Sequence, residues 1–411
     1  MKILTVLTYY APHWTGLTKH AVLVAEQLAA RGHDVTVLCA QHAPHLPKVE
    51  LRNGVRVVRL KPLARFSRGV VAPAFPATLA RLLGEHEAVQ MHTPLPEALL
   101  VATLCRLLGR RLVMTHHGDV VMPSGLTNWF VQRAAFGLLW AAGHLSDHVT
   151  AYSRDYAENS PLLSSLSDRI SHVYPPVELP QPDPVRAVEW RTRLGLADRR
   201  LVGFAGRWVE EKGFDYLLHG MSRVREQLPN VHFVYAGDPN VVYEDFFARC
   251  ASLVENNRAH LTLLGLITDP QRLADFYAMC DVIAIPSRTD NMPLVEVEAL
   301  LSGTPVVVTD IPGARVVIRE TGYGRIVRAG DPAALAAAIV EVLRKPDRYR
   351  PCRRAVREVF DTQNTITRYE RLLRGLDTRA GDAQTTEQQP VSISRDIEVN
   401  AASHTADELD R

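Results

Sequence analysis

Residues 201–214 read Leu-Val-Gly-Phe-Ala-Gly-Arg-Trp-Val-Glu-Glu-Lys-Gly-Phe. The apolar run ending at Ala205 predicts a buried strand, and the pattern over 214–227 predicts the helix that follows it. The loop between them carries Arg207 and Lys212, and open parallel sheets bind ligands at such strand ends. Two cations beside a helix N-terminus suit a diphosphate. The alternative is two solvated charges on an ordinary loop.

The same alternation of short apolar runs and helical patterns continues on both sides of this stretch. It predicts parallel βαβ units and therefore an α/β fold. The expected strands cover 3–7, 35–39, 55–60, 88–92, 111–115, 148–152, 201–205, 232–236, 261–264, 282–285 and 306–309. The chain has 411 residues, which is too long for one ordinary core. We therefore expect two Rossmann-like parallel-sheet domains.

A proline-rich segment marks the boundary between these domains. Residues 174–184 read YPPVELPQPDP, and so many prolines cannot belong to a helix or a central strand. The tail is rich in Gln, Thr, Ser and Asp and lacks aromatic residues, a composition typical of disorder. The predicted division is an N-terminal domain at 1–178, a hinge at 179–190, a C-terminal domain at 191–353, a further helix at 354–376, and a disordered tail at 377–411.

Composition excludes several classes of protein. The formal net charge of +2 gives no general attraction to nucleic acid. The five cysteines are widely spaced without a C-x-x-C pair, which predicts free thiols rather than disulfides or a zinc site. The N-terminal apolar run is too short for a signal peptide, and no stretch is long enough to span a bilayer. We expect a cytoplasmic protein.

A second motif covers 286–300 and reads PSRTDNMPLVEVEAL. A strand is predicted to end at Pro286 and a helix to begin near Pro293. Asp290 lies in the connecting loop and Glu298 about one and a half turns into the helix. Carboxylates so placed can accept hydrogen bonds from the vicinal hydroxyls of a sugar or ribose. The alternative is that Asp290 only caps the helix and Glu298 is a surface residue.

Two further motifs follow predicted strands of the N-terminal half. Thr115-His-His-Gly-Asp119 places His117 at a strand end, where its ring can donate a hydrogen bond to a sugar hydroxyl. The two histidines and Asp119 could also be metal ligands, although nearly consecutive residues suit one ion poorly. The segment 9–20 carries Gly16 just before a helix, where the backbone can approach a ligand closely. An ordinary turn is the alternative there.

Together these motifs resemble those of GT-B glycosyltransferase family 4, over about residues 1–376. The resembling elements are Y-Y-x-P-x-x-x-G at 9–16, T-x-H-G at 115–118, G-R-x-x-x-x-K-G at 206–213, and P-S followed by an acid, seven residues and Glu at 286–298. The resemblance implies two Rossmann-like domains that face a central cleft. The N-terminal domain would lie on the acceptor side, the C-terminal domain would bind the nucleotide sugar, and the helix at 354–376 would return to the N-terminal domain. Three departures are Asp290 in place of the usual Glu, Asn-Met-Pro after it in place of Gly-Phe-Gly, and Thr15 in place of a first Gly.

The resemblance also implies roles for individual residues. It assigns Arg207 and Lys212 to the donor diphosphate and to catalysis, and Asp290 and His117 to the transferred sugar. The remaining donor-binding residues are Gly16, Leu294, Val295 and Glu298, of which Glu298 holds the ribose.

The implied activity is that of a retaining hexosyltransferase. It would move a sugar from a nucleotide-diphosphate sugar to a glycan or lipid-linked acceptor, as in polysaccharide biosynthesis. No Asp-x-Asp occurs in the chain, so we expect no metal ion and no other cofactor. Arg207, Lys212 and helix dipoles would neutralise the leaving nucleotide. Because the loop after Asp290 is altered, a catalytically silent nucleotide-sugar-binding protein or partner subunit is the alternative.

A basic segment in the N-terminal half suggests contact with a membrane. Residues 48–68 carry seven Lys or Arg and one Glu, and an apolar stretch follows. Basic charge beside apolar surface is typical of peripheral binding to an anionic membrane. The alternative is a solvated strand and loop. The apolar helix predicted at 126–145 is a second candidate surface, although packing in the core explains it more simply.

Overall fold

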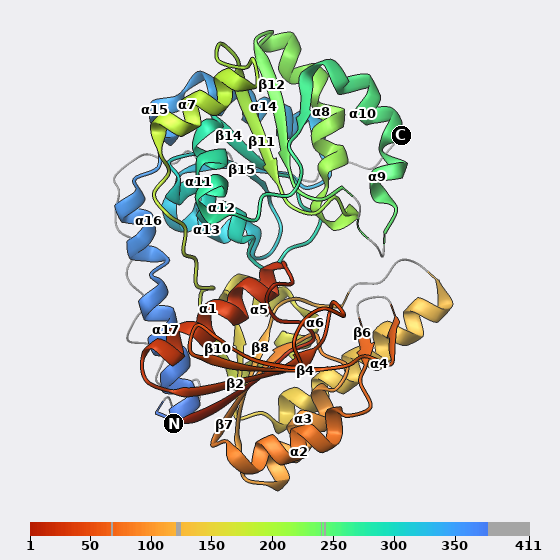
Figure 1. Cartoon of the computed structure of the whole chain (residues 1–411). Coiled ribbons are helices and arrows are strands. Elements are labelled where there is room, and N and C mark those ends of the chain that lie inside the picture. The colour runs from red at the N-terminus through yellow and green to blue at the C-terminus, as the bar shows by residue number, and fades with distance from the viewer. Residues whose placement is uncertain (67–68, 121–124, 240, 242–243, 377–411) are drawn as a thin grey trace, which may run out of the picture.

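The structure is a computed structural model that describes residues 1–66, 69–120, 125–239, 241 and 244–376. The tail predicted to be disordered, 377–411, lies outside these residues. The chain forms two α/β domains stacked one above the other, and two C-terminal helices run from the second domain back to the first (Figure 1).

The N-terminal domain is built on a sheet of eight described strands that are parallel except at one edge. In sheet order the strands are β10 (Ile170–His172), β9 (His148–Ala151), β8 (Arg111–His116), β7 (Ala88–Thr93), β1 (Lys2–Val6), β2 (Asp34–Ala40), β4 (Val55–Leu60) and β3 (Val49–Arg52). Edge strand β3 pairs antiparallel with β4. Two short strands, β5 (Ala64–Phe66) and β6 (Gly69–Val71), form a separate antiparallel pair.

The helices of this domain connect and cover the strands. They are α1 (Gly16–Ala30), α2 (Phe75–Glu85), α3 (Ala98–Leu107), α4 (Leu126–Leu145), α5 (Arg154–Asn159), α6 (Pro161–Ser164) and the 3-10 turn η1 (Ser167–Arg169). Helix α1 begins at Gly16 because the Thr15 side chain accepts a hydrogen bond from the Thr18 amide. This cap fixes the end of α1 that lies nearest to the candidate site.

The C-terminal domain is built on a parallel sheet of six described strands. They are, in sheet order, β13 (Leu261–Leu263), β12 (Val231–Ala236), β11 (Arg200–Ala205), β14 (Val282–Ile285), β15 (Val306–Thr309) and β16 (Gly324–Val327). The strand order reverses between β11 and β14, as it does between β1 and β7 in the first sheet. Such reversals are where open α/β sheets bind ligands.

Helices and short turns connect these strands too. They are α7 (Pro184–Arg193), η2 (Glu210–Lys212), α8 (Phe214–Gln227), α9 (Phe246–Arg249), α10 (Ala251–Asn257), η3 (Arg258–His260), α11 (Pro270–Met279), α12 (Leu294–Leu301), α13 (Ala314–Thr321), α14 (Pro332–Arg344) and α15 (Pro346–Tyr349). Asp331 caps α14 through the amides of Ala333 and Ala334, as its position before Pro332 predicts.

The connection between the domains differs from the predicted hinge at 179–190. Residues 173–183 have no regular structure, but α7 starts at Pro184, with Asp183 as its cap. Ala187 and Trp190 of α7 are buried in the core of the C-terminal domain, where α7 packs on α11. The second half of the predicted hinge is therefore part of that domain.

The C-terminal helical segment is also more divided than predicted. The single helix expected at 354–376 is two helices, α16 (Arg353–Val359) and α17 (Thr362–Arg374), because Asp361 is extended and caps α17. Helix α17 packs on α1, β7 and β8. Its Ile366 and Tyr369 are fully buried in the core of the N-terminal domain.

Each of the eleven predicted strands is present to within one or two residues. The prediction missed β3, β5, β6, β10 and β16, which are short, polar or at a sheet edge. The cysteines are unpaired, and all but the exposed Cys352 are buried. No helix in the described ranges is long and apolar enough to cross a membrane.

Candidate functional site

The loop after β11 is anchored by an aromatic cluster. Trp208 is fully buried and its ring lies 4.2 Å from that of Phe214 and 4.8 Å from that of Tyr235, between ring centroids. Arg207 is therefore attached to a rigid residue, while its own guanidinium is partly exposed and lies 2.9 Å from a carboxylate oxygen of Glu211. The loop presents this cation at the carboxyl end of the sheet.

The next turn brings Lys212 beside the second motif. Gly213 has φ +64°, and a Cβ there would lie 2.0 Å from the Pro286 carbonyl oxygen. Only glycine permits this approach, which joins the end of β14 to the loop after β11. Lys212 Nζ consequently lies 2.5 Å from Asp290 Oδ2. Two residues 78 positions apart in the chain thus form one partly buried ion pair.

Asp290 is not a helix cap. Helix α12 begins at Leu294 after Pro293, which has no side chain able to cap it. The Asp290 carboxylate accepts hydrogen bonds from the Ser287 hydroxyl and the Asn291 amide in addition to Lys212. This arrangement holds the carboxylate at the strand end, so the capping alternative is excluded.

Glu298 is also not a surface residue. Its side chain is 5% exposed, and its two oxygens each have a partner at 2.7 Å. Oε2 accepts from the hydroxyl of Tyr277, and Oε1 accepts from Lys19 Nζ. Lys19 belongs to α1 of the other domain, so this carboxylate lies where the two domains meet. Leu294 and Val295, in the first turn of the same helix, are partly buried.

A second glutamate of α12 is buried without a partner. Glu296 is fully buried, and neither of its carboxylate oxygens has a hydrogen-bond partner among the described residues. Burial raises the pKa of Glu296 well above its usual range; the charge of Asp290 also raises it, and that of Lys212 lowers it. The sequence reasoning did not single out this residue.

His117 follows β8 in the N-terminal domain and is held by protein groups at both ring nitrogens. Its Nδ1 lies 2.6 Å from the Tyr152 hydroxyl and its Nε2 lies 2.8 Å from His92 Nδ1. Burial lowers the pKa of His117 well below its usual range, and the neighbouring histidines add to the shift. The ring is therefore neutral at pH 7.

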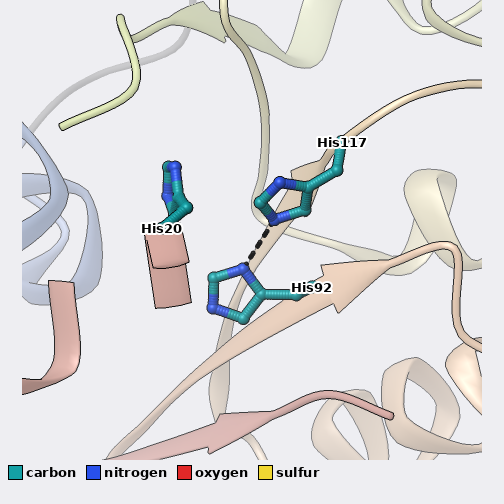
Figure 2. Close-up of side chains that lie close together, drawn as sticks. All are labelled: His20, His92 and His117. Atoms are coloured by element: carbon teal, nitrogen blue, oxygen red, sulfur yellow. Dashed lines mark hydrogen bonds between the residues drawn. The ribbon is translucent and has the colours of Figure 1, made fainter. Parts of the chain in front are cut away.

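His116 and Asp119 do not join His117 in a metal site. His116 Nε2 lies 3.2 Å from Asp119 Oδ1 and its Nδ1 lies 3.1 Å from the Thr93 hydroxyl. The histidines that do converge in the described part of the chain are His20, His92 and His117, each with a ring nitrogen within 4.8 Å of the others. Figure 2 shows these three rings, from α1, β7 and the end of β8.

Gly16 is the first residue of α1, and a Cβ there would meet nothing within 4 Å. The loop before it approaches the other domain. Burial, together with the charges of His42 and Arg207, lowers the pKa of His13 to about 4. Arg207 of the C-terminal domain is therefore close enough to the loop before Gly16 for its charge to lower the pKa of His13.

Direct bonds between the domains show that the two sets of strand ends face each other. The Asn291 side chain donates to the His116 carbonyl at 3.3 Å, and Arg315 makes a double hydrogen bond to Asp155. The site thus brings the predicted residues of four separate motifs to one place. Three residues of the site were not predicted from the sequence, because no local sequence pattern distinguishes them: Lys19, Tyr277 and Tyr152. They are recognised only by the residues that they contact in the folded structure.

Comparison with known proteins agrees with this arrangement. Residues 14–181 match the family described as Glycosyltransferase Family 4, and residues 199–345 match the one described as Glycosyl transferases group 1. The chain belongs to the family-4 type of GT-B glycosyltransferases. Its fold is GT-B, with two Rossmann-like domains.

Relatives cover nearly the whole described chain. A GDP-mannose-dependent alpha-(1-6)-phosphatidylinositol monomannoside mannosyltransferase from Mycolicibacterium smegmatis is 28% identical over 360 residues, 84% of this chain and 90% of the relative. Among solved structures, sucrose-phosphate synthase from Thermosynechococcus elongatus superposes with a TM-score of 0.75 at 21% identity, covering 91% of this chain and 98% of that one. HepE from Anabaena in complex with UDP gives 0.72 at 20% identity, covering 91% and 100%. The protein is therefore a glycosyltransferase.

Proposed function

We propose that this glycosyltransferase is a retaining hexosyltransferase that uses a nucleotide-diphosphate sugar. The observation that carries the proposal is the grouping of Arg207, Lys212, Asp290 and Glu298 at the strand reversal between β11 and β14. The two cations suit the diphosphate, Glu298 suits the ribose, and Asp290 suits the hydroxyls of the transferred sugar. The N-terminal domain faces them with His117 and Gly16.

The chemistry requires stabilisation of charge rather than a protein nucleophile. The bond between the sugar's anomeric carbon and the β-phosphate oxygen breaks, and the acceptor oxygen bonds to the same face of that carbon. The leaving phosphate takes the acceptor proton. Arg207 and Lys212 stabilise the negative charge that grows on the diphosphate. Lys212 is paired with Asp290 in the structure, so the donor would share this cation. NMR of the product tests retention, and inversion at the transferred sugar would contradict it.

No divalent metal is part of this proposal. Neutralisation of the diphosphate by Arg207, Lys212 and the N-terminus of the adjacent helix α8 makes a bound cation unnecessary. Activity should persist in the presence of EDTA at a concentration well above that of any contaminating metal. A loss of activity that magnesium or manganese restores, while EDTA saturated with calcium leaves activity intact, would contradict metal independence.

GDP-mannose is the donor to test first. The support is the similarity to a mycobacterial enzyme whose name specifies GDP-mannose, while HepE, a structural neighbour, was solved with UDP. A thermal-shift series with GDP-, UDP- and ADP-sugars would rank them, since a ligand at 100 times its Kd adds about 2.7 kcal/mol of stability. Slow hydrolysis of the best donor without acceptor would separate an enzyme from a catalytically silent binding protein.

We further propose a lipid-linked acceptor presented at an anionic membrane surface. The support is helix α4, whose exposed fractions are 82% for Leu126, 54% for Trp129, 65% for Phe130, 49% for Val131 and 43% for Trp140. The helix contains no Asp or Glu, and the Arg133 guanidinium stacks over Trp129. Exposed aromatic groups beside cations are typical of peripheral membrane contact. The simpler prediction, that the helix at 126–145 packs in the core, is therefore wrong for the face that carries these exposed residues.

The basic segment 48–68 contributes less than predicted. Arg59 is buried, where it donates to the Ala11 carbonyl and pairs with Glu50 at 2.6 Å. Lys61 and Arg65 are exposed, and Arg68 lies outside the described residues. The charges that can meet a membrane are therefore fewer than the sequence indicates, and α4 supplies the apolar contact.

A further inference from the structure

Four side chains at the end of the N-terminal sheet form one continuous line. Tyr152, directly after β9, lies 2.6 Å from His117 Nδ1 and 3.1 Å from His20 Nδ1. His117 Nε2 lies 2.8 Å from His92 Nδ1, the contact drawn as a dashed line in Figure 2. His20, Tyr152, His117 and His92 are thus joined by three contacts of hydrogen-bond length.

A hydrogen-bonded line explains these distances better than a metal ion does. Two imidazole nitrogens bound to one tetrahedral ion at about 2.0–2.1 Å lie roughly 3.3 Å apart. His92 and His117 approach to 2.8 Å, which leaves room for a proton between them but not for an ion. In addition, both ring nitrogens of His117 already have protein partners.

Such a line has only two proton arrangements if every group is neutral. Burial lowers the pKa of His92 to about 3 and those of His20 and His117 well below their usual range, and burial raises the pKa of Tyr152. Each histidine therefore carries one N–H, and Tyr152 keeps its proton. The hydroxyl of Tyr152 then donates either to His117 or to His20, and every other proton follows from that choice.

The distances from the Tyr152 hydroxyl to His117 and to His20 indicate which of the two histidines accepts its hydrogen bond. Hydroxyl donors make hydrogen bonds of about 2.7–2.8 Å, shorter than the roughly 2.9–3.0 Å that N–H donors make. The shorter contact, to His117 Nδ1, is the one that Tyr152 donates, and the longer contact is an N–H of His20 donating to Tyr152. His117 then has no proton on Nδ1, so its single proton lies on Nε2.

We infer that Tyr152 is a positioning residue that fixes His117 as the neutral Nε2–H tautomer. If the function proposed above is correct, His117 contacts the sugar as a hydrogen-bond donor through Nε2, and His92 Nδ1 accepts that hydrogen bond until a ligand is present. The remaining nitrogens at the two ends, Nε2 of His20 and Nε2 of His92, are buried without a partner among the described residues. Because neither end of the line has a partner among the residues described that would favour one proton arrangement, the orientation of the Tyr152 hydroxyl determines the tautomer of His117.

The first test needs no substrate. Protein labelled with ¹⁵N-histidine, with the resonances assigned through single His→Gln variants, reports the protonated nitrogen of each ring directly. We expect the Nε2–H form for His117 in the wild-type protein and a mixture of tautomers in Tyr152→Phe. A wild-type His117 protonated on Nδ1 would overturn the inference. So would a bound transition metal found by elemental analysis and lost in His92→Gln.

The second test is kinetic. The amide nitrogen of Gln reaches the Nε2 position and that of Asn the Nδ1 position, so His117→Gln should retain more activity than His117→Asn. Tyr152→Phe should lower kcat at least about tenfold, as loss of the correct tautomer does elsewhere, with little change in donor KM. The same change should have no effect in the His117→Gln background, because Gln has no tautomer to fix.

The outcomes separate the inference from the proposed function. Tyr349→Phe is the matched control, since it removes the hydroxyl of a buried tyrosine that donates to Glu341 in the other domain, and it should leave kcat unchanged. If Tyr152→Phe lowers kcat equally in both backgrounds, the inference is wrong. If no donor is turned over but the wild-type tautomer is Nε2–H, the proposed function fails and the tautomer assignment stands.

Discussion

Single residues decide how the donor site is assembled. Gly213 permits the close approach to Pro286 that brings Lys212 to within 2.5 Å of Asp290. A larger residue would need both φ +64° and space that the Pro286 carbonyl fills. Lys212 pairs with Asp290 in the structure, and in the proposed function it would also contact the diphosphate of the donor.

Replacing Lys212 by Ala should lower kcat/KM by roughly 10²-fold or more, because one preorganised contact to a developing anion is lost in a closed site. The measurement is steady-state transfer with the best donor, with circular dichroism to show that the variant is folded. Lys345→Ala, an exposed lysine on the far side of the same domain, is the control. Turnover near the wild-type rate in folded Lys212→Ala would refute the assignment.

Glu296 should make stability depend on pH. Its pKa is raised in the folded state, so the folded state retains a proton that the unfolded state loses above pH about 4.5. The wild-type protein should lose stability as pH rises from there towards the folded pKa, by up to about 1.4 kcal/mol per pH unit. Glu296→Gln removes this titration and keeps the shape.

The variant Glu296→Gln should therefore gain stability relative to the wild-type protein as pH increases. Urea unfolding at pH 5 and pH 8 measures the difference, and Glu189→Gln, on an exposed face of α7, is the control. Equal pH dependence in Glu296→Gln and wild type would show that this carboxyl is not protonated in the folded protein.

At the scale of elements, α4 shows that apolar composition does not establish burial. The helix is mostly apolar, and it packs chiefly on α3 and also contacts α6. Leu139 and Ala142 pack in the core, whereas Trp129 and Phe130 remain exposed. The buried face and the exposed face of α4 have the same apolar composition. The sequence pattern alone therefore could not predict which face is buried.

Changing Trp129 and Phe130 together to Ser should weaken co-sedimentation with vesicles that contain anionic phospholipid, because the variant loses apolar area that enters the interface. Binding by the wild-type protein should decrease with salt, as screening of the basic groups requires. The matched control is Val185→Ser with Val188→Ser, two exposed apolar residues of α7 in the other domain. Wild-type protein that stays in the supernatant at low salt would indicate a soluble acceptor instead.

At the scale of the whole molecule, polar contacts join the two domains at several places among the described residues. The ion pair of Lys19 with Glu298 is one, and that of Asp155 with Arg315 is another. The first occupies the carboxylate that we assign to the ribose. In the proposed function, ribose hydroxyls would share this carboxylate with Lys19, which would couple the position of α1 to the occupancy of the proposed donor site.

Replacing Lys19 by Met should tighten binding of the nucleoside diphosphate several-fold, because a buried carboxylate without its cation gains more from ribose hydroxyls. Calorimetric titration with GDP and UDP measures the effect. Asp155→Asn loosens the other contact without touching Glu298, so its affinity should be unchanged. Equal effects of both substitutions would mean that domain closure alone controls binding, and weaker binding by Lys19→Met would mean that Lys19 contacts the nucleotide.

Helices and central strands could be predicted because their signals are local. The strand 201–205 and the helix 214–227 appear where periodicity places them, and Asp331, directly before Pro332, caps α14. The motifs around Lys212, Glu298 and His117 were found because each follows a buried strand. Family resemblance supplied their roles, and those roles stay predictions.

The α/β class, the two domains and the strand ends at which chemistry can occur were all predictable from the amino-acid sequence, because hydrophobic periodicity and turn residues are local signals that extend over a few neighbouring residues. Contacts between distant segments became visible only in the folded structure: Lys19 with Glu298 across 279 residues, and Tyr152 with His117. The same holds for the burial of Glu296 without a hydrogen-bond partner among the described residues. The tertiary structure also decided which face of α4 is exposed. These properties depend on which surfaces meet after folding, and contacts between distant segments leave no periodic pattern in a single chain.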